Sequence, residues 1–319
     1  MRRYVIKRLA QAVGVLWAAY TLSFLVLDFL PGDPVTAMAG AGMDSGDVDP
    51  ARLAALRHEY GFDKPILAQY ADYLGRAVRG DFGDAVSTGR PVTSTLAEAL
   101  PQTLQLTGAA LLLAVLLGGG LAVVATYTSQ RWLRQLLLSL PPLGVSVPTF
   151  WVGLLLVEVF SFRLHWFPAF GNDGLRGLVL PALTLAIPTG ALVAQVLAKS
   201  LLTALDQAYV ETARAKGAGR WRVHLRHALR NASLPALTVV GLLVGQLIAG
   251  SVVVETVFSR DGLGRVTAAA VTVQDIPVVQ GVVVFGALIF VATNLLVDLV
   301  YPLLDPRIVV ASNRRASLV

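Results

Sequence analysis

The stretch that decides the fold is LQLTGAALLLAVLLGGGLAVVATY, residues Leu104–Tyr127, which contains no charged side chain. An α-helix rises about 1.5 Å per residue, so about 20 such residues cross the hydrocarbon core of a bilayer, which is about 30 Å thick. Because no water is available there for backbone N–H and C=O groups, an apolar stretch of this length predicts a membrane-spanning helix.

Similar apolar stretches occur on both sides of this one. They are Leu9–Leu30, Leu136–Phe160, Leu178–Ala198, Leu234–Val254 and Val278–Val300. Composition agrees, since 55% of the residues are hydrophobic and 14% charged, whereas soluble domains carry about 25% charged residues. We therefore expect an all-α integral membrane protein with about six transmembrane helices.

The first apolar stretch has a competing interpretation as a signal peptide, because Ala37-Met38-Ala39 resembles a cleavage site. The apolar region of a signal peptide is usually only about 7–15 residues long, and Leu9–Leu30 is longer. An uncleaved first helix is therefore favoured.

A segment of soluble-like composition separates the first two predicted spans. It runs from residue 31 to 100 and is rich in acids, including Asp33, Asp44, Asp47, Asp49, Asp63, Asp72, Asp81 and Asp84. Its turn-forming residues bound two predicted short helices, Pro50–Tyr60 and Pro65–Val78. The segment is expected to form a small subdomain outside the membrane.

The distribution of Lys and Arg predicts the orientation. With six spans both termini share a side, and that side receives the basic residues of 2–8, 131–134, 199–230 and 307–315. The opposite side has Arg163, Arg176, Arg260 and Arg265 in its short loops. Because cytoplasmic loops carry an excess of Lys and Arg, both termini are expected in the cytoplasm and the acidic subdomain outside it.

These observations predict four regions. Residues 1–30 form a cytoplasmic N-terminal segment and the first span, and residues 31–100 the extracytoplasmic subdomain. Residues 101–305 form a five-helix core that includes a cytoplasmic loop at 199–235, and residues 306–319 form a cytoplasmic tail.

The loop at 199–235 is the most informative segment, and it reads KSLLTALDQAYVETARAKGAGRWRVHLRHALRNASLP. A helix-forming run reaches Lys216, where Gly217 and Gly219 stop it, and a basic helical pattern then resumes and is expected to end at Pro235. Two short helices meeting at a glycine turn are therefore predicted.

The basic arm of this loop has three other interpretations: a lipid-binding surface, a metal site and a nucleic-acid site. Arg222, Arg226 and Arg230 recur at i, i+4 spacing, a pattern typical of a surface that binds anionic lipid headgroups. His224 and His227 are spaced i, i+3, but no further ligands accompany them, so a metal site is disfavoured. A nucleic-acid role is disfavoured because basic residues beside apolar spans already have a membrane explanation.

Within this loop, Glu211-Thr212-Ala213 followed by Gly217 and by Leu234-Pro235 resembles the E-A-A…G…LP loop of bacterial ABC importer permeases. The resemblance implies that the loop docks as a coupling helix into a cleft of an ATPase subunit. It assigns this contact to Glu211, Thr212, Ala213, Lys216 and Gly217. Thr212 stands where the motif has a second alanine, which leaves the docking role in place.

A second resemblance covers nearly the whole chain and indicates the peptide and nickel branch of these permeases, specifically the first permease subunit of dipeptide and oligopeptide importers. Its motifs stand in the family's order. They are FLPGDPV (Phe29–Val35), LRHEYGFDKPILAQYADYL (Leu56–Leu74), RGDFG (Arg79–Gly83), LPQTLQLTGAA (Leu100–Ala110), SVPTFWVGLLL (Ser146–Leu156), YVETARAKG (Tyr209–Gly217), HALRN (His227–Asn231), GLG (Gly262–Gly264), NLLVDLVY (Asn294–Tyr301) and DPRI (Asp305–Ile308). Departures at Ala208, at 195–200 and at Asp261 bear on the cargo and leave the coupling residues intact.

The sequence contains no G-x-x-x-x-G-K-[ST] phosphate loop, so ATP and Mg²⁺ are expected on partner subunits and no cofactor on this chain. The family implies a non-catalytic subunit of a bacterial inner-membrane complex. The implied partners are a second homologous permease, two ATPase domains, an extracytoplasmic substrate-binding protein and membrane lipid.

Ionisable and polar residues inside spans are costly and often functional. Glu158, Gln246, Glu255, Asn294 and Asp298 are therefore candidates for lining the transport path, although Glu255 and Asp298 stand near span ends, where a carboxylate can also reach water.

Two rival classes remain at this stage: a secondary transporter or channel that needs no ATPase, and a membrane-embedded enzyme. The second is disfavoured because no H-E-x-x-H motif, Ser/His pair or paired aspartates stand at span depth. The sequence leaves the cargo open among dipeptides, longer peptides, nickel chelates, glutathione and other small solutes.

Overall fold

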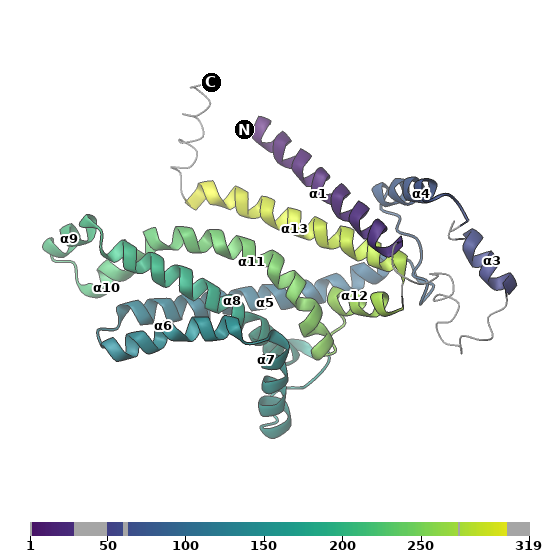
Figure 1. The fold of residues 1–319 in the computed structure, drawn as a ribbon. Coiled ribbons are helices and arrows are strands. Elements are labelled where there is room, and N and C mark those ends of the chain that lie inside the picture. Colours follow the sequence, from purple (N-terminus) through teal and green to yellow (C-terminus); the bar gives the residue numbers. More distant parts are fainter. Residues whose placement is uncertain (1, 29–49, 60–62, 274, 305–319) are drawn as a thin grey trace. The chain divides into compact units, whose positions relative to one another are not determined.

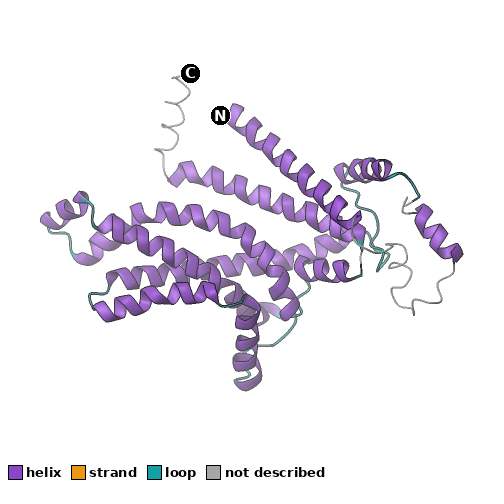
Figure 2. Cartoon of the chain, in the orientation of Figure 1, coloured by secondary structure: helices purple, strands orange, loops and turns teal. Residues whose placement is uncertain are grey.

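The computed structural model describes residues 2–28, 50–59, 63–273 and 275–304. Within these ranges the chain consists of helices and loops, with one isolated antiparallel bridge between Asp84 and Pro91 (Figure 2). The predicted all-α fold is confirmed. The FLPGDPV motif at 29–35, the DPRI motif at 305–308 and the predicted tail at 306–319 lie outside the described residues.

The chain divides into two compact units, and the first comprises Met1–Thr103 and Asp261–Val291. Its helices are α1 (Arg2–Asp28), α3 (Pro50–Glu59), α4 (Ile66–Val78), α12 (Leu263–Thr272) and the first parts of α5 (Val92–Tyr127) and α13 (Ile276–Leu304). The two short helices predicted between the first spans are confirmed, since α3 and α4 match them to within a residue at each end.

Polar side chains fix the helix starts of this unit. Asp275 precedes α13 and is buried, and its carboxylate accepts hydrogen bonds from the backbone N–H (2.9 Å) and Oγ (2.8 Å) of Ser87. Thr103 Oγ1 accepts the N–H of Leu263 at 2.8 Å, one of the first-turn donors of α12 that have no partner within the helix. These hydrogen bonds connect segments distant in sequence around one core, which is formed by Ala85, Val92, Leu96, Ala99, Leu263, Ala270, Val278 and Val279.

The second unit comprises Leu104–Arg260 and Ala292–Val319. After the main part of α5 come α6 (Arg131–Ser146), α7 (Thr149–Leu156), the π-helix η1 (Val157–Arg163) and α8 (Gly174–Leu205). The short helices α9 (Ala208–Ala215) and α10 (Arg220–Arg222), the π-helix η2 (Val223–Ala228) and α11 (Leu229–Val257) follow (Figure 1).

Helix α8 packs against α6, α7 and α11 within this unit, and its crossing with α5 depends on glycine. A Cβ atom built on Gly118 would lie 2.2 Å from the carbonyl oxygen of Gly190, and one on Gly190 would lie 3.0 Å from that of Ala114. Small residues let membrane helices approach this closely. At Gly118 the glycine run of α5 therefore serves helix packing.

Within the part of the chain that the structure describes, four helices are long and apolar enough to cross a membrane. They are α5, α8, the continuous helix Arg220–Val257, and the part of α13 from Ile276 to Thr293. The pair α6 and α7–η1 makes a fifth if it is one span, and the apolar part of α1, Val13–Val26, is shorter. The structure thus gives four or five of the roughly six predicted spans by this measure.

The predicted span Leu136–Phe160 is not one straight helix. Its two arms, Arg131–Ser146 and Thr149–Arg163, meet at 103°. Val147 is extended there, with ψ of 130°, because the ring of Pro148 disfavours the helical conformation of the preceding residue. Pro141 and Pro142, in contrast, lie inside α6 without breaking it.

The prediction that the basic arm of the 199–235 loop ends at Pro235 is wrong. Pro235 lies inside α11, and the helix runs on from the loop into the span without a break. Proline is tolerated in membrane helices where neighbouring helices and local π adjustments compensate for the lost hydrogen bond, and the π-helix η2 lies shortly before it.

Candidate functional site

The predicted coupling loop forms a separate helical turn at one end of the second unit, where α9 and α10 lie together (Figure 1). Helix α9 begins after Gln207, which is extended, and it packs against η2. Val210 is fully buried, whereas Glu211 and Thr212 are exposed and Ala213 is half-buried. One face of this short helix is therefore anchored to the unit, and the face with the predicted contact residues is open to a partner.

The end of α9 is fixed by its glycine. Gly217 has φ of +79°, a left-handed conformation that residues with a Cβ atom rarely adopt. Its N–H bonds to the carbonyl of Arg214 (2.9 Å), and the N–H of Ala218 bonds to that of Ala213 (3.0 Å). This pair of hydrogen bonds is the Schellman motif, which satisfies two of the last free carbonyls of a helix. The glycine turn predicted from the sequence is thus a defined structural element.

The helices that carry the loop are joined by a core of small side chains. The core consists of Ala122, Leu197, Ala198, Leu201, Ala204, Ala228, Ala232 and Ala236. These residues come from α5, α8, η2 and α11, and alanine allows helix axes to approach closely. The loop therefore stands on a tightly packed base.

A group of side chains at this base was not predicted from the sequence. We call it the Tyr127 cluster, and its members are Thr126, Tyr127, Arg220, Trp221 and His224. The ring of Tyr127 makes edge contacts with those of Trp221 and His224, each with centroids 5.5 Å apart, and the Arg220 guanidinium lies 4.7 Å from its centroid.

A signal for this cluster exists in the sequence. Trp221 and His224 are spaced i, i+3 and therefore share a helix face, and Tyr127 ends a predicted span. His224 is bonded to Thr126 within the cluster. Among the described residues, no group of three or more His, Cys, Asp or Glu is placed to hold a metal ion.

The remaining basic residues of the loop have a different environment. Arg222, Arg226 and Arg230 are all exposed. Their side chains remain available for the lipid headgroups that their spacing suggests.

The candidate path residues come from three elements. Glu158 lies in η1 and forms an ion pair with Arg163 at 3.0 Å, Gln246 is exposed on α11, and Glu255 near the end of α11 is fully buried. Asn294 and Asp298 lie in α13, and their side chains fall outside the described part of the structure.

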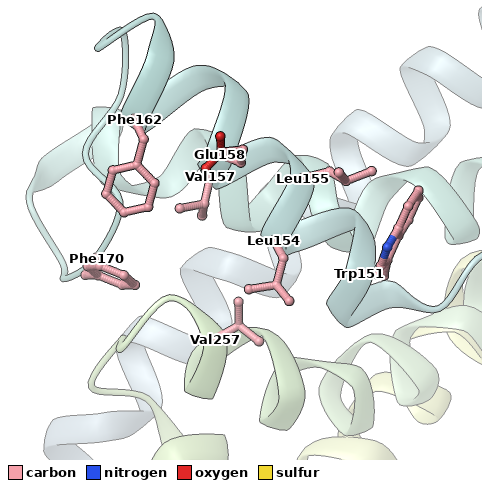
Figure 3. A pocket seen from close by; sticks show the side chains of 8 residues that line it. All are labelled: Trp151, Leu154, Leu155, Val157, Glu158, Phe162, Phe170 and Val257. Carbon is pink, nitrogen blue, oxygen red and sulfur yellow. The ribbon is translucent and has the colours of Figure 1, made fainter.

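Glu158 borders an apolar pocket of about 410 Å³ between the α7–η1 arm and the end of α11 (Figure 3). Leu154 and Val157 face Val257 across it, and Phe162 and Phe170 close one end. Glu158 is the one ionisable group among these lining residues.

Several helices long enough to cross a membrane, together with a helical loop that stands free at one end, define a membrane transport subunit. Residues 102–310 match the family described as the binding-protein-dependent transport system inner membrane component, and residues 1–107 match the N-terminal domain of such components. The chain belongs to this family. It is a permease subunit of an ABC importer, a non-catalytic multi-pass protein of the inner membrane from a family without bound cofactors, and membership of this family implies ATPase and binding-protein partners.

Full-length relatives agree with this assignment. A protein of Brucella suis biovar 1 (strain 1330), provisionally named a peptide transport system permease protein, is 38% identical over 316 residues, which are 97% of this chain and 99% of the relative. The glutathione transport system permease protein GsiC of Escherichia coli (strain K12) is 37% identical over 308 residues, with the same coverage.

The fold also resembles a solved transporter. A chain of the MetNI methionine ABC transporter in an inward-facing conformation matches with a TM-score of 0.58 at 15% identity, covering 66% of this chain and 96% of that one. This similarity concerns the fold alone.

Proposed function

We propose that this chain forms part of the pore of an ATP-driven importer of short peptides, which an extracytoplasmic binding protein delivers. The observation that carries the proposal is the end-to-end identity to relatives named as peptide and glutathione permeases. Glutathione is itself a tripeptide, so both names describe one class of cargo: a short chain with charged termini.

The coupling function belongs to the loop around α9. Glu211, Thr212, Ala213, Lys216 and Gly217 contact the ATPase subunit, and this assignment is supported by the exposure of all but the half-buried Ala213. Because α9 is anchored through Val210 and stopped by the Schellman motif at Gly217, it is stiff enough to transmit a displacement.

The complete importer contains a second homologous permease and two ATPase domains, and the extracytoplasmic subdomain at 31–100 receives the binding protein. Both termini and the 199–235 loop face the cytoplasm, as the Lys and Arg distribution indicates. Glu158, Gln246, Glu255, Asn294 and Asp298 remain our candidates for the path.

Reconstitution tests the cargo. We expect proteoliposomes with both permeases, the ATPases and the binding protein to accumulate a labelled dipeptide or glutathione only when ATP and the binding protein are present. Accumulation of a nickel chelate and of no peptide would contradict the peptide cargo and would make the nickel chelate the cargo of the same importer.

Labelling tests the orientation. The chain has no cysteine, so a single Glu211→Cys variant reports on one position without background. A membrane-impermeant maleimide should modify it in inside-out vesicles and not in intact cells. Modification in intact cells would contradict the coupling assignment.

A further inference from the structure

The last turn of α5 and the first turns of the basic arm are held together by contacts of several kinds. Tyr127 is the final residue of α5, and its carbonyl has no partner inside the helix. Arg220 Nη2 donates a hydrogen bond to this carbonyl while the guanidinium lies over the Tyr127 ring. A cation is favourable at the negative end of a helix, so this contact both caps and neutralises it.

His224 makes a second, directional contact with α5. Thr126 Oγ1 donates its single hydrogen to the Ala122 carbonyl at 2.7 Å, which leaves its oxygen able to accept a hydrogen bond from the Nε2–H of His224, 3.0 Å away. His224 is only 3% exposed. The contact therefore fixes the ring orientation of a buried side chain, and this oriented ring makes the edge contact with Tyr127.

We propose that the Tyr127 cluster is a positioning latch that makes the coupling loop move with α5, a role that rests on the proposed docking of α9 onto an ATPase. The chain connects the loop covalently to α8 on one side and to α11 on the other. The latch adds a third attachment, to the first helix of the core, so that a displacement of α9 reaches α5 directly.

This third attachment matters because the chain between α9 and α10 is not helical. Between α9 and η2 the backbone passes through Lys216–Gly219, where the chain is not helical and Gly217 is left-handed. A turn of this kind can act as a hinge, and a loop free to hinge would absorb displacement. Helix α9 also packs against η2. The latch lies immediately after the turn and holds the arm that contains η2 to α5, so a displacement of α9 reaches α5 without passing through the turn.

The first test measures transport per ATP hydrolysed by the reconstituted importer. Tyr127→Leu removes the ring contacts with Trp221, His224 and Arg220, and we expect it to lower the ratio of uptake to ATP hydrolysis at least threefold. Tyr127→Phe keeps the ring and should retain the parent ratio. The latch is overturned if both variants behave alike or if Tyr127→Leu leaves the ratio unchanged.

A second pair of variants guards against a folding defect at Tyr127. His224→Leu removes the hydrogen bond to Thr126 and should lower the ratio of uptake to ATP hydrolysis. His224→Gln offers an amide N–H in place of the ring N–H and should keep at least half of the parent ratio. Loss of the ratio in both variants, with assembly intact, would contradict the role given to the hydrogen bond.

The third test does not depend on transport, so it separates the latch from the proposed function. Spin labels at Ser129→Cys and Arg214→Cys, both exposed positions in a chain without cysteine, report the distance between the end of α5 and α9 in nanodiscs. We expect a narrow distribution in the parent chain and a broad one in Tyr127→Leu. An equally narrow distribution in Tyr127→Leu overturns the latch, whereas absence of uptake by the parent importer refutes the proposed function alone.

Discussion

At Gly217 the backbone conformation, rather than the space around it, restricts the side chain. Its φ is +79°, and a Cβ atom there would meet no atom within 4 Å. The left-handed conformation costs a residue with a side chain about 1–2 kcal/mol. We expect Gly217→Ala to disturb the Schellman motif, to misplace α9, and to lower uptake per ATP in the reconstituted importer several-fold.

Gly219 provides the matched control for that prediction. It is exposed, has φ of −63° and ψ of 155°, and offers the same open space for a Cβ atom. Gly219→Ala should leave coupling near the parent level. Equal losses of uptake per ATP in the two variants would show that coupling does not depend on the left-handed conformation of Gly217.

Arg260 is a buried cation whose hydrogen bonds hold a loop to the end of α11. It is 2% exposed, and its Nη1 donates to the carbonyls of Gly177 at 3.0 Å and Gly171 at 3.4 Å. Hydrogen bonds from charged groups contribute about 1.5–3 kcal/mol each, and loss of the donor removes the bond to the buried carbonyl of Gly177. Arg260→Met should therefore lower the apparent Tm of the purified chain by several degrees.

The control is an arginine whose side chain lies at the surface. Arg265 forms an ion pair with Asp261 at 2.8 Å, but the two side chains are 47% and 77% exposed. Exposed pairs contribute about 0–1 kcal/mol, so Arg265→Met should shift Tm little. A larger Tm shift for Arg265→Met than for Arg260→Met would contradict the stabilising role given to the hydrogen bonds of Arg260.

At the scale of elements, the crossing of α5 and α8 is a close backbone contact that one glycine permits. Gly118→Ala would drive a methyl group into the Gly190 carbonyl, and overpacking of this kind costs about 1–3 kcal/mol. Gly120→Ala, two residues on, meets nothing within 4 Å and removes a flexible helix residue, which favours the helix by about 0.5–1 kcal/mol. Thermal unfolding in detergent should show a lower Tm for the first variant and an equal or higher one for the second.

The helices themselves could be predicted from the sequence because their causes are local. Charge-free length predicts the part of α5 from Leu104 to Tyr127, although the helix begins earlier, at Val92. Turn-forming residues around Pro50 and Pro65 bound α3 and α4. The glycine turn at Gly217 is predicted for the same reason, whereas its Schellman hydrogen bonds are known from the structure.

What the sequence did not predict depends on neighbouring elements. Pro148 breaks a span and Pro235 does not, although both are prolines in apolar stretches. Before Pro148 the chain is extended at Val147, whereas Pro235 lies in a helix that already runs through η2 and α11. The Tyr127 cluster unites residues about a hundred positions apart, and local periodicity carries no information about such a pairing.

At the scale of the whole molecule, the family match and the structure share one boundary, although Asp261–Val291 belongs to the first compact unit and to the second family region. The two family regions meet at residues 102–107, and the two compact units meet between Thr103 and Leu104, inside the helix α5. One helix is thus shared by the N-terminal unit and by the core that carries the coupling loop.

A permease subunit whose energy comes from a partner should be inactive alone. The sequence has no phosphate loop, so the purified chain in proteoliposomes should neither hydrolyse ATP nor accumulate a labelled dipeptide, with or without an imposed proton or sodium gradient. Addition of the second permease, the ATPases and the binding protein should confer both activities together, because the proposed function couples them through α9. Gradient-driven uptake by the chain alone would support the rival class of secondary transporters and would leave the coupling loop without its assigned role.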